Sequence, residues 1–268
     1  MTASLGIDIG GTGIKGAPVD LIRGRLLDER FRLLTPHPAT PEAVSKVVGH
    51  VVEHFAWRDT IGCTFPAIVL KGFTLTATNV DAAWIGTDAA RVLGAAAGHA
   101  VTVINDADAA GLAETRFGAA RGNPGVVLVL TFGTGIGSAL FIDGHLVPNM
   151  QLGHLEVDGK NGELRASDAV RQKQDLSWKR WAKRVNRYLE EVETFCVPEV
   201  IVIGGGVSKN ADEFLPRLKA RARIVPAALG NDAGIIGAAM TGAMAISSIR
   251  RRAPRQVRSS AAAGTAQR

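Results

Sequence analysis

The same short pattern occurs twice in this chain, and it constrains the fold more than any other feature of the sequence. Residues 5–14 contain an apolar strand, the small polar residue Asp8, one apolar residue and a glycine-rich turn; residues 128–136 repeat this order with Thr131. A second apolar stretch follows each turn, so each copy predicts a β-hairpin. Such a duplication favours two similar lobes whose turns face one another across a cleft.

Strands and helices alternate along the chain, which predicts an α/β fold whose inner strands are mostly parallel. The predicted strands are 4–9, 14–19, 26–34, 61–65, 101–104, 126–132, 138–142 and 200–203. The predicted helices are 41–55, 87–96, 107–117, 176–195, 211–222 and 231–244, with Thr40 as the N-cap of the first. We expect a first lobe at residues 1–107, a second at 108–248 whose last helix can pack back on the first, and a basic disordered tail at 249–268.

Composition excludes several classes of protein. The 268 residues are 46% hydrophobic and 21% charged, which is typical of a folded chain. Two cysteines, Cys63 and Cys196, are too few for a disulfide framework or a four-cysteine zinc site. No apolar run reaches the ~20 residues of a membrane span, and no secretory signal is recognisable. We therefore expect a cytoplasmic protein that does not associate with a membrane.

The net charge of +6 is concentrated in residues 165–187 and 250–258. A solvated helix face and a flexible tail account for the two segments, and a surface for a polyanion is the alternative.

Both glycine-rich turns have the chemistry of a phosphate site, because their backbone N–H groups are not obstructed by side chains. Asp8, at a strand end, is placed to hold Mg²⁺ beside a phosphate. The expected phosphate-binding residues are Asp8, Gly10, Gly11, Thr12, Gly13, Lys15, Thr131, Gly133, Thr134 and Gly135. Either turn alone is also compatible with an ordinary hairpin, and the two together favour the phosphate site.

Asp106 follows the strand at 101–104, at the seam between the predicted lobes. A carboxylate there is placed to accept a proton from a hydroxyl that attacks phosphorus. The alternative is that Asn105, Asp106 or Asp108 caps the next helix, and Asp108 fits that role better than Asp106.

Three further places carry binding chemistry. Asn79, and the pair His154 and Glu156, offer amide, imidazole and carboxylate groups that suit sugar hydroxyls, although each is also compatible with an ordinary polar loop. The loop of Gly204, Gly205 and Gly206 follows a buried strand, and it suits either an adenosine ring or a tight turn.

In combination, these residues resemble the ROK-type sugar kinases, which have the two-lobed actin-like ATPase fold, ribonuclease H-like and of the hexokinase type. The resemblance covers residues 4–248. It depends on Asp8-Ile-Gly-Gly-Thr12 with Lys15, Asn79 with Trp84, Asn105-Asp106, Thr131-Phe-Gly-Thr-Gly135, Gly153-His154 and Gly204-Gly-Gly206. Residues 152–159 look most like the polyphosphate glucokinases of actinobacteria and the inorganic polyphosphate/ATP glucomannokinases.

This resemblance implies transfer of a phosphoryl group from polyphosphate, ATP or both to the 6-hydroxyl of glucose, and in some members of mannose. It implies Asp106 as the catalytic base, with Mg²⁺ accompanying the donor at Asp8. The implied sugar contacts are Asn79, Asn105, Asp106, His154 and Glu156; Gly204, Gly205 and Gly206 are implied at the nucleotide. With polyphosphate as donor, Lys179, Lys183, Arg184 and Arg187 are expected to form a groove for the polymer.

The chain departs from the family pattern in three places. Asp158-Gly-Lys-Asn-Gly162 replaces a cysteine-rich loop, so no zinc is expected; Gln151 replaces a glutamate, and Pro66-Ala67 replaces a Pro-Gly pair. No helix-turn-helix fits before Leu5, so no nucleic-acid partner is expected. A homodimer stays open, as do a sugar-sensing regulator without turnover, an ATP-only hexokinase and a nucleotide switch.

Overall fold

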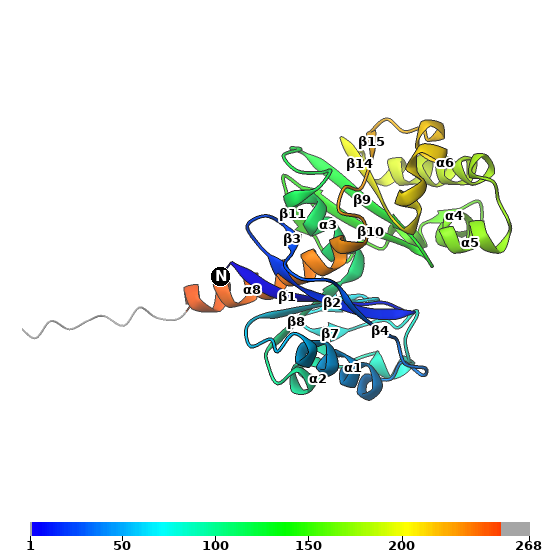
Figure 1. Ribbon diagram of the computed structural model, residues 1–268. Coiled ribbons are helices and arrows are strands. Elements are labelled where there is room, and N and C mark those ends of the chain that lie inside the picture. Colours follow the sequence, from blue (N-terminus) through cyan, green and yellow to red (C-terminus); the bar gives the residue numbers. More distant parts are fainter. Residues whose placement is uncertain (1, 253–268) are drawn as a thin grey trace, which may run out of the picture.

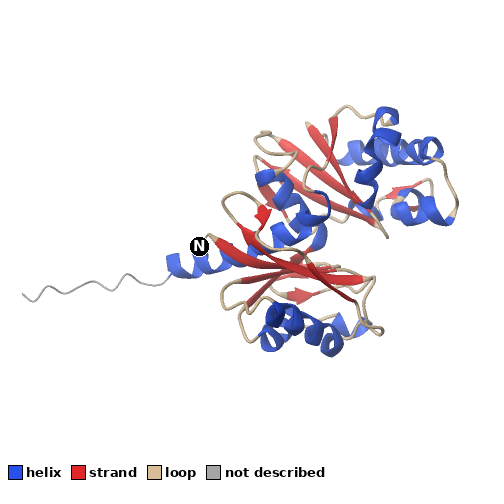
Figure 2. Cartoon of the chain, in the orientation of Figure 1, coloured by secondary structure: helices blue, strands red, loops and turns tan. Residues whose placement is uncertain are grey.

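The computed structural model describes residues 2–252, and side chains up to residue 245. Figure 1 shows two α/β lobes with one helix layer between them, and Figure 2 shows the helices that flank each sheet. The fold class predicted from the sequence is confirmed. No helix in the described part of the chain is long and apolar enough to cross a membrane.

The first lobe is built on a sheet with the strand order β3-β2-β1-β5-β8, in which β4 also pairs with β2. Its strands are β1 (Ala3–Ile9), β2 (Gly13–Asp20), β3 (Arg25–Leu26), β4 (Phe31–Leu34), β5 (Ile61–Phe65) and β8 (Val101–Asn105). β1 pairs antiparallel with β2 and parallel with β5, and β5 pairs parallel with β8. The other elements are α1 (Pro41–His54), α2 (Ala89–Ala97), the short strands β6 (Val69–Leu70) and β7 (Phe73–Thr74), and the 3₁₀ turn η1 (Ala82–Trp84).

The second lobe repeats this plan with the strand order β11-β10-β9-β14-β15. Its strands are β9 (Val126–Phe132), β10 (Ile136–Ile142), β11 (His145–Val147), β14 (Val200–Gly205) and β15 (Arg223–Pro226), with a small pair of β12 (Glu156–Val157) and β13 (Lys160–Asn161). Its α-helices are α3 (Asp106–Phe117), α4 (Glu163–Ala166), α5 (Asp168–Lys173), α6 (Trp178–Phe195), α7 (Ala211–Phe214) and α8 (Ala233–Arg252). The 3₁₀ turns are η2 (Leu152–His154), η3 (Gly206–Asn210), η4 (Leu215–Arg217) and η5 (Gly230–Asp232).

The central strands β1, β5, β9 and β14 are largely buried, because both faces of each sheet are covered. In the first lobe, Leu5 and Ile7 belong to the core that includes Val44 and Val48 of α1. The opposite face meets α8, whose Ile235 and Ile236 form a separate buried cluster.

Helix α8 crosses the first-lobe sheet and α3 at backbone contact distance. A Cβ on Gly62 of β5 would lie 1.7 Å from the carbonyl oxygen of Ala238, and one on Gly237 would lie 1.8 Å from that of Ala109. Only glycine permits these approaches. The last described helix therefore packs on the first lobe.

Several predicted boundaries were wrong. The strand predicted at 26–34 is two short strands, β3 and β4. The helix predicted at 211–222 stops at Phe214, because Pro216 lacks the N–H that a longer helix needs. Strand β15 and helices α4 and α5 were not predicted, while the cap at Thr40 is confirmed by its bond from the Ala43 N–H. Helix α8 continues to Arg252, and residues 253–268 of the predicted tail lie outside the described residues.

The contact at Gly62 predicts the cost of a single added methyl group. We expect Gly62→Ala to destabilise the protein by about 3 kcal/mol, because the sheet and α8 must separate to admit it. Thermal unfolding followed by circular dichroism measures this. Gly206→Ala is the matched control, since its methyl group would meet no atom within 4 Å; equal melting temperatures for the two variants would contradict the prediction.

Candidate active site

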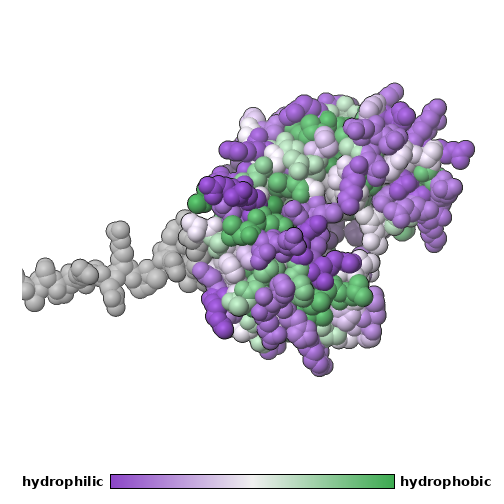
Figure 3. Space-filling view, viewed as in Figure 1, coloured by the Kyte–Doolittle hydropathy of each residue, from purple (hydrophilic) through white to green (hydrophobic). Residues whose placement is uncertain are grey.

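The two glycine-rich turns lie on opposite walls of one cleft, as the duplicated pattern predicted. The cleft has a volume of about 320 Å³ and is lined by residues of both lobes. Figure 3 shows a hollow between the lobes that is bordered largely by hydrophilic side chains. The predicted site residues that line it are Gly10, Gly11, Asn79, Asn105, Asp106, Thr131, Gly133, Thr134, Gly135, His154 and Gly205.

The first turn joins β1 to β2 and is closed by a bond from the Gly10 N–H to the Gly13 carbonyl, at 3.0 Å. Behind it, the Lys15 ammonium lies 3.0 Å from a carboxylate oxygen of Asp8. The Thr64 hydroxyl donates to the other oxygen of Asp8 at 2.6 Å. Asp8 and Lys15 are therefore already paired with each other. Thr12 and Gly13 belong to the turn but do not line the cleft.

The sequence analysis missed a cation beside this turn. Arg32 on β4 donates to the Thr12 carbonyl at 3.3 Å. Because β4 pairs with β2 beside the turn, the guanidinium is a second positive charge there. Its pairing is not encoded in the local sequence, so only the tertiary structure places it.

The second turn joins β9 to β10, and all four of its predicted residues line the cleft. Helix α5 holds it in place, because the Ala169 N–H donates to the Gly133 carbonyl at 3.0 Å. Gly205, at the end of the neighbouring β14, also lines the cleft, whereas Gly204 and Gly206 do not. The triple-glycine strand end thus lies beside the second turn.

Asp106 is the first residue of α3 and is exposed to the cleft. The cap of α3 is Asn105, whose side-chain oxygen accepts from the N–H groups of Ala107 at 2.9 Å and Asp108 at 3.1 Å. Of the three alternative caps that the sequence offered, Asn105 is therefore the cap, and Asp108 is not. Asp106 also accepts from the Ala107 N–H at 2.9 Å, and its side chain remains open to the cleft.

Desolvation by the surrounding protein raises the pKa of Asp106 to about 6, and the nearby Asp8 carboxylate adds to the rise. The side chain nevertheless touches solvent in the cleft. A carboxyl with a raised pKa is a stronger base once it is deprotonated.

The remaining polar residues expected at the site divide between the cleft and the surface. Asn79, Gln151 and His154 line it, whereas Glu156 is exposed on β12 and does not. Glu163 lines it instead, with one carboxylate oxygen 3.7 Å from His154 Nδ1. Glu163 was missed in the sequence, although its position at the start of α4 after Gly162 was a usable signal.

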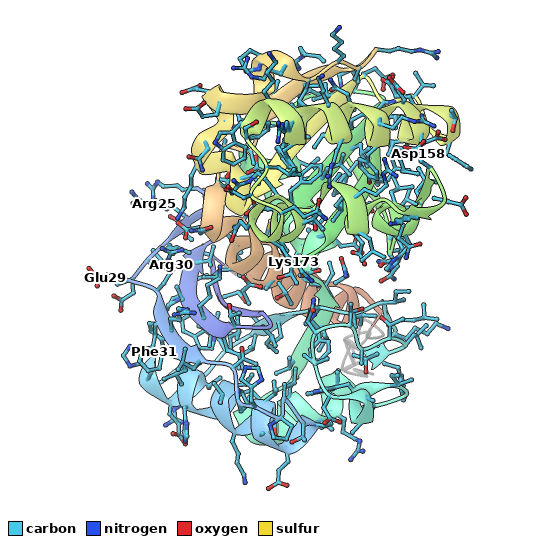
Figure 4. The ribbon with its side chains drawn as sticks, turned by 90° about the vertical axis from the view of Figure 1, so that its right-hand side faces the viewer. Arg25, Glu29, Arg30, Phe31, Asp158 and Lys173 are labelled. Carbon is cyan, nitrogen blue, oxygen red and sulfur yellow. The ribbon has the colours of Figure 1, made fainter. Side chains whose placement is uncertain are left out.

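The basic residues of α6 lie away from the cleft lining. Arg187 is paired with Asp158 at 3.0 Å, with Glu190 and with Glu191, and Arg184 donates to Gln174 and to the Arg165 carbonyl. Lys179 and Lys183 are exposed, with no ion pair among the described residues. Figure 4 shows Asp158 on the second lobe and Lys173 at the edge of that lobe toward the first.

The residues fit a divalent cation that takes few of its ligands from the protein. Among the described residues, no group of three or more His, Cys, Asp and Glu side chains could hold a metal ion. Mg²⁺ needs only one or two carboxylates when phosphate oxygens and waters complete its shell. Asp8, which raises the pKa of Asp106 through its charge, is the carboxylate suited to this.

Comparison with known proteins gives consistent matches. The profile of the ROK family matches residues 4–167. The polyphosphate glucokinase of Mycobacterium tuberculosis (strain ATCC 25618 / H37Rv) is 53% identical over 236 residues, which cover 88% of this chain and 89% of that protein.

Solved structures agree. The inorganic polyphosphate/ATP-glucomannokinase from Arthrobacter sp. strain KM superposes with a TM-score of 0.88 at 51% identity, covering 91% of this chain and all of that one. A ROK family glucokinase from Streptomyces griseus, solved with glucose and AMPPNP, has a TM-score of 0.79 and covers 90% of this chain and 99% of that one. At 23% identity this second match shows the fold alone.

The environment of Asp106 predicts a measurable titration. In ¹³C NMR, its carboxyl should titrate near pH 6, because burial and Asp8 both disfavour the charged form. Asp8→Asn removes the nearby negative charge and should lower that midpoint. A midpoint below about pH 5 in the unmodified protein would contradict the raised pKa.

Proposed function

Because the chain belongs to the ROK family, we propose that it is a sugar kinase that transfers a phosphoryl group from polyphosphate or ATP to the 6-hydroxyl of glucose. One observation carries the proposal: both phosphate-type turns and the exposed carboxylate of Asp106 line the same cleft. Two enzymes that it resembles over most of their length, a polyphosphate glucokinase and a polyphosphate/ATP-glucomannokinase, support this donor and acceptor chemistry. Mannose as a second acceptor and a cytoplasmic location stay predictions.

The hexose would lie between the polar groups of the cleft, with Asn79, Gln151, His154 and Glu163 at its hydroxyls. These are amide, imidazole and carboxylate groups, which pair with hydroxyl donors and acceptors. Asn105 is a poorer candidate for a direct contact than the sequence suggested. Its oxygen caps α3, and its amide donates to the Ala67 carbonyl at 3.0 Å.

Asp106 would accept the proton of the 6-hydroxyl as that oxygen attacks the terminal phosphorus in line. This requires the carboxylate form, so a pKa of about 6 predicts that the rate falls as the pH drops below that value. Closure of the lobes would exclude water, which otherwise competes with the sugar for the phosphoryl group.

The two turns would bind the donor phosphates through their backbone N–H groups and the Thr131 and Thr134 hydroxyls. Mg²⁺, when bound beside Asp8, would neutralise charge on the transferred phosphoryl. The Gly204–Gly206 segment reaches the cleft through Gly205, and an adenosine ring would lie there when ATP is the donor.

Hexose phosphorylation distinguishes this proposal from a sugar-sensing regulator and an ATP-only hexokinase. Purified protein is incubated with Mg²⁺, a panel of hexoses and either ATP or polyphosphate, and hexose 6-phosphate is measured. We expect product with glucose from both donors. Activity with ATP alone would support the hexokinase, and sugar binding without product would support the regulator.

Asp106→Asn tests the base within the same assay. Turnover should fall by about 10²- to 10⁴-fold while the hexose dissociation constant changes little, because the amide keeps the shape but cannot take the proton. Asp212→Asn, an exposed aspartate of α7 outside the cleft, is the matched control. A near-normal rate for Asp106→Asn would remove Asp106 from this role.

With polyphosphate as the donor, exposed basic residues of α6 would bind the part of the polymer that extends beyond the cleft. Only Lys179 and Lys183 are free to meet a polyanion, because Arg184 and Arg187 are engaged by the protein itself. We expect Lys179→Glu with Lys183→Glu to raise the KM for long polyphosphate by about tenfold and to leave the KM for ATP unchanged. As the control, Lys46→Glu with Arg91→Glu makes the same change in net charge on the first lobe. If Lys179→Glu with Lys183→Glu raises the KM values for polyphosphate and ATP equally, the predicted groove is wrong.

A further inference from the structure

One asparagine side chain joins the two lobes beside the cleft. Asn149 lies between β11 and η2 of the second lobe, and Val69 belongs to β6 of the first. The Val69 N–H donates to the Asn149 side-chain oxygen at 3.0 Å, and the Asn149 amide donates to the Val69 carbonyl at 2.9 Å. The side chain thus supplies a donor and an acceptor as a neighbouring β-strand would.

The backbone of Asn149 is held in turn by Asp108 of α3. The Asn149 N–H donates to one carboxylate oxygen of Asp108 at 2.8 Å. Asp108 is 1% exposed, and its other oxygen has no hydrogen-bond partner among the described residues. A carboxylate buried with one oxygen unpartnered costs stability, so its presence favours a role in geometry.

Asp106 lies within this network. Asn105, the residue before it, donates to the Ala67 carbonyl, and Asp108, two residues after it, holds Asn149. The first turn of α3 therefore fixes the segment 66–69, of which Pro66 and Ala67 line the cleft, directly at one point and through Asn149 at another.

The same loop carries the sugar-facing side chains. Ser138 donates to the Met150 carbonyl at 2.5 Å and accepts from the Leu152 N–H at 2.9 Å. Gln151 and His154, just beyond Asn149, line the cleft. A displacement of Asn149 would therefore move this wall of the sugar site relative to Asp106.

We propose that Asn149 and Asp108 are positioning residues, which tie the lobes together and set the sugar-binding loop 149–154 against Asp106. This inference rests on the proposed kinase function. In-line attack needs the hexose hydroxyl held within a fraction of an ångström, and a displacement of about 1 Å costs on the order of 10²-fold in rate. The tie supplies that constraint beside the cleft, through Asp108 in the first turn of α3.

Asn149→Gly is the first test, because glycine keeps the backbone conformation at φ 60° while removing the side chain. We expect kcat/KM for glucose to fall by about 10- to 100-fold with little change in the KM for polyphosphate. Hydrolysis of the donor without sugar transfer should rise relative to glucose phosphorylation, because closure is less well defined.

Asn186→Ala is the matched control. Asn186 also joins a backbone donor and acceptor, with its amide donating to the Arg217 carbonyl at 2.9 Å and its oxygen accepting from the Lys219 N–H at 2.8 Å. All three residues belong to the second lobe, so this variant loses two similar bonds without freeing the lobes. It should lower the melting temperature and leave the kinetic constants for glucose unchanged.

Asp108 variants test whether the two residues act in series. Asp108→Ala should reproduce the kinetic defect of Asn149→Gly, and the double variant should be no worse than either one. Asp108→Asn keeps an oxygen that can accept from the Asn149 N–H, so it should restore most of the loss.

Amide hydrogen exchange tests the contact between Asn149 and Val69 independently of turnover. The Val69 amide should exchange faster in Asn149→Gly than in the unmodified protein, with no such change in Asn186→Ala. If the unmodified protein forms no hexose 6-phosphate, the proposed function is wrong. The exchange rate of the Val69 amide still tests whether Asn149 joins the two lobes. Unchanged Val69 exchange, or a glucose kcat/KM in Asn149→Gly equal to that of Asn186→Ala, would overturn the positioning role.

Discussion

The packing of α3 and α8 between the two sheets is the constraint on which the rest of the structure depends. Helix α8 follows the last strand of the second lobe, yet it lies against β1 and β5 of the first. Its approach is close enough that Gly62 and Gly237 admit no Cβ. This contact brings both sheets onto one pair of helices, so that the turns at the ends of β1 and β9 open into a common cleft.

Three aspartates near that cleft show how environment separates residues of one type. Asp8 is paired with Lys15 and Thr64, and a carboxylate at this place is suited to a cation. Asp106 faces the cleft with a raised pKa, which suits proton transfer. Asp108 is buried, and burial also raises its pKa to about 6; its visible role is to hold the Asn149 backbone. Groups whose environments differ in this way can take different parts in one reaction.

Local patterns in the sequence were enough to predict the α/β class, the two hairpins and the position of Asp106 at a strand end. Each depends on residues close in the chain, where glycine turns and apolar strands have a short-range physical signature. The same reasoning failed at residues 211–222, where Pro216 stops the helix, and at Glu156, which the structure leaves outside the cleft while Glu163 lines it. In that second case the order of residues was clear, but the direction of each side chain depends on how the loop folds against β10.

By itself, the sequence determined which groups are available: two glycine-rich turns, a carboxylate between them, and a set of polar residues suited to a sugar. Only the tertiary structure decided which of these groups meet. It joined Asn149 to Val69 and Asp108, placed Arg32 beside the first turn, and paired Arg184 with the Arg165 carbonyl and Arg187 with Asp158. The physical reason is range: turn and strand propensities act over a few residues, whereas these partners are separated by many residues and are brought together by the packing of sheets and helices.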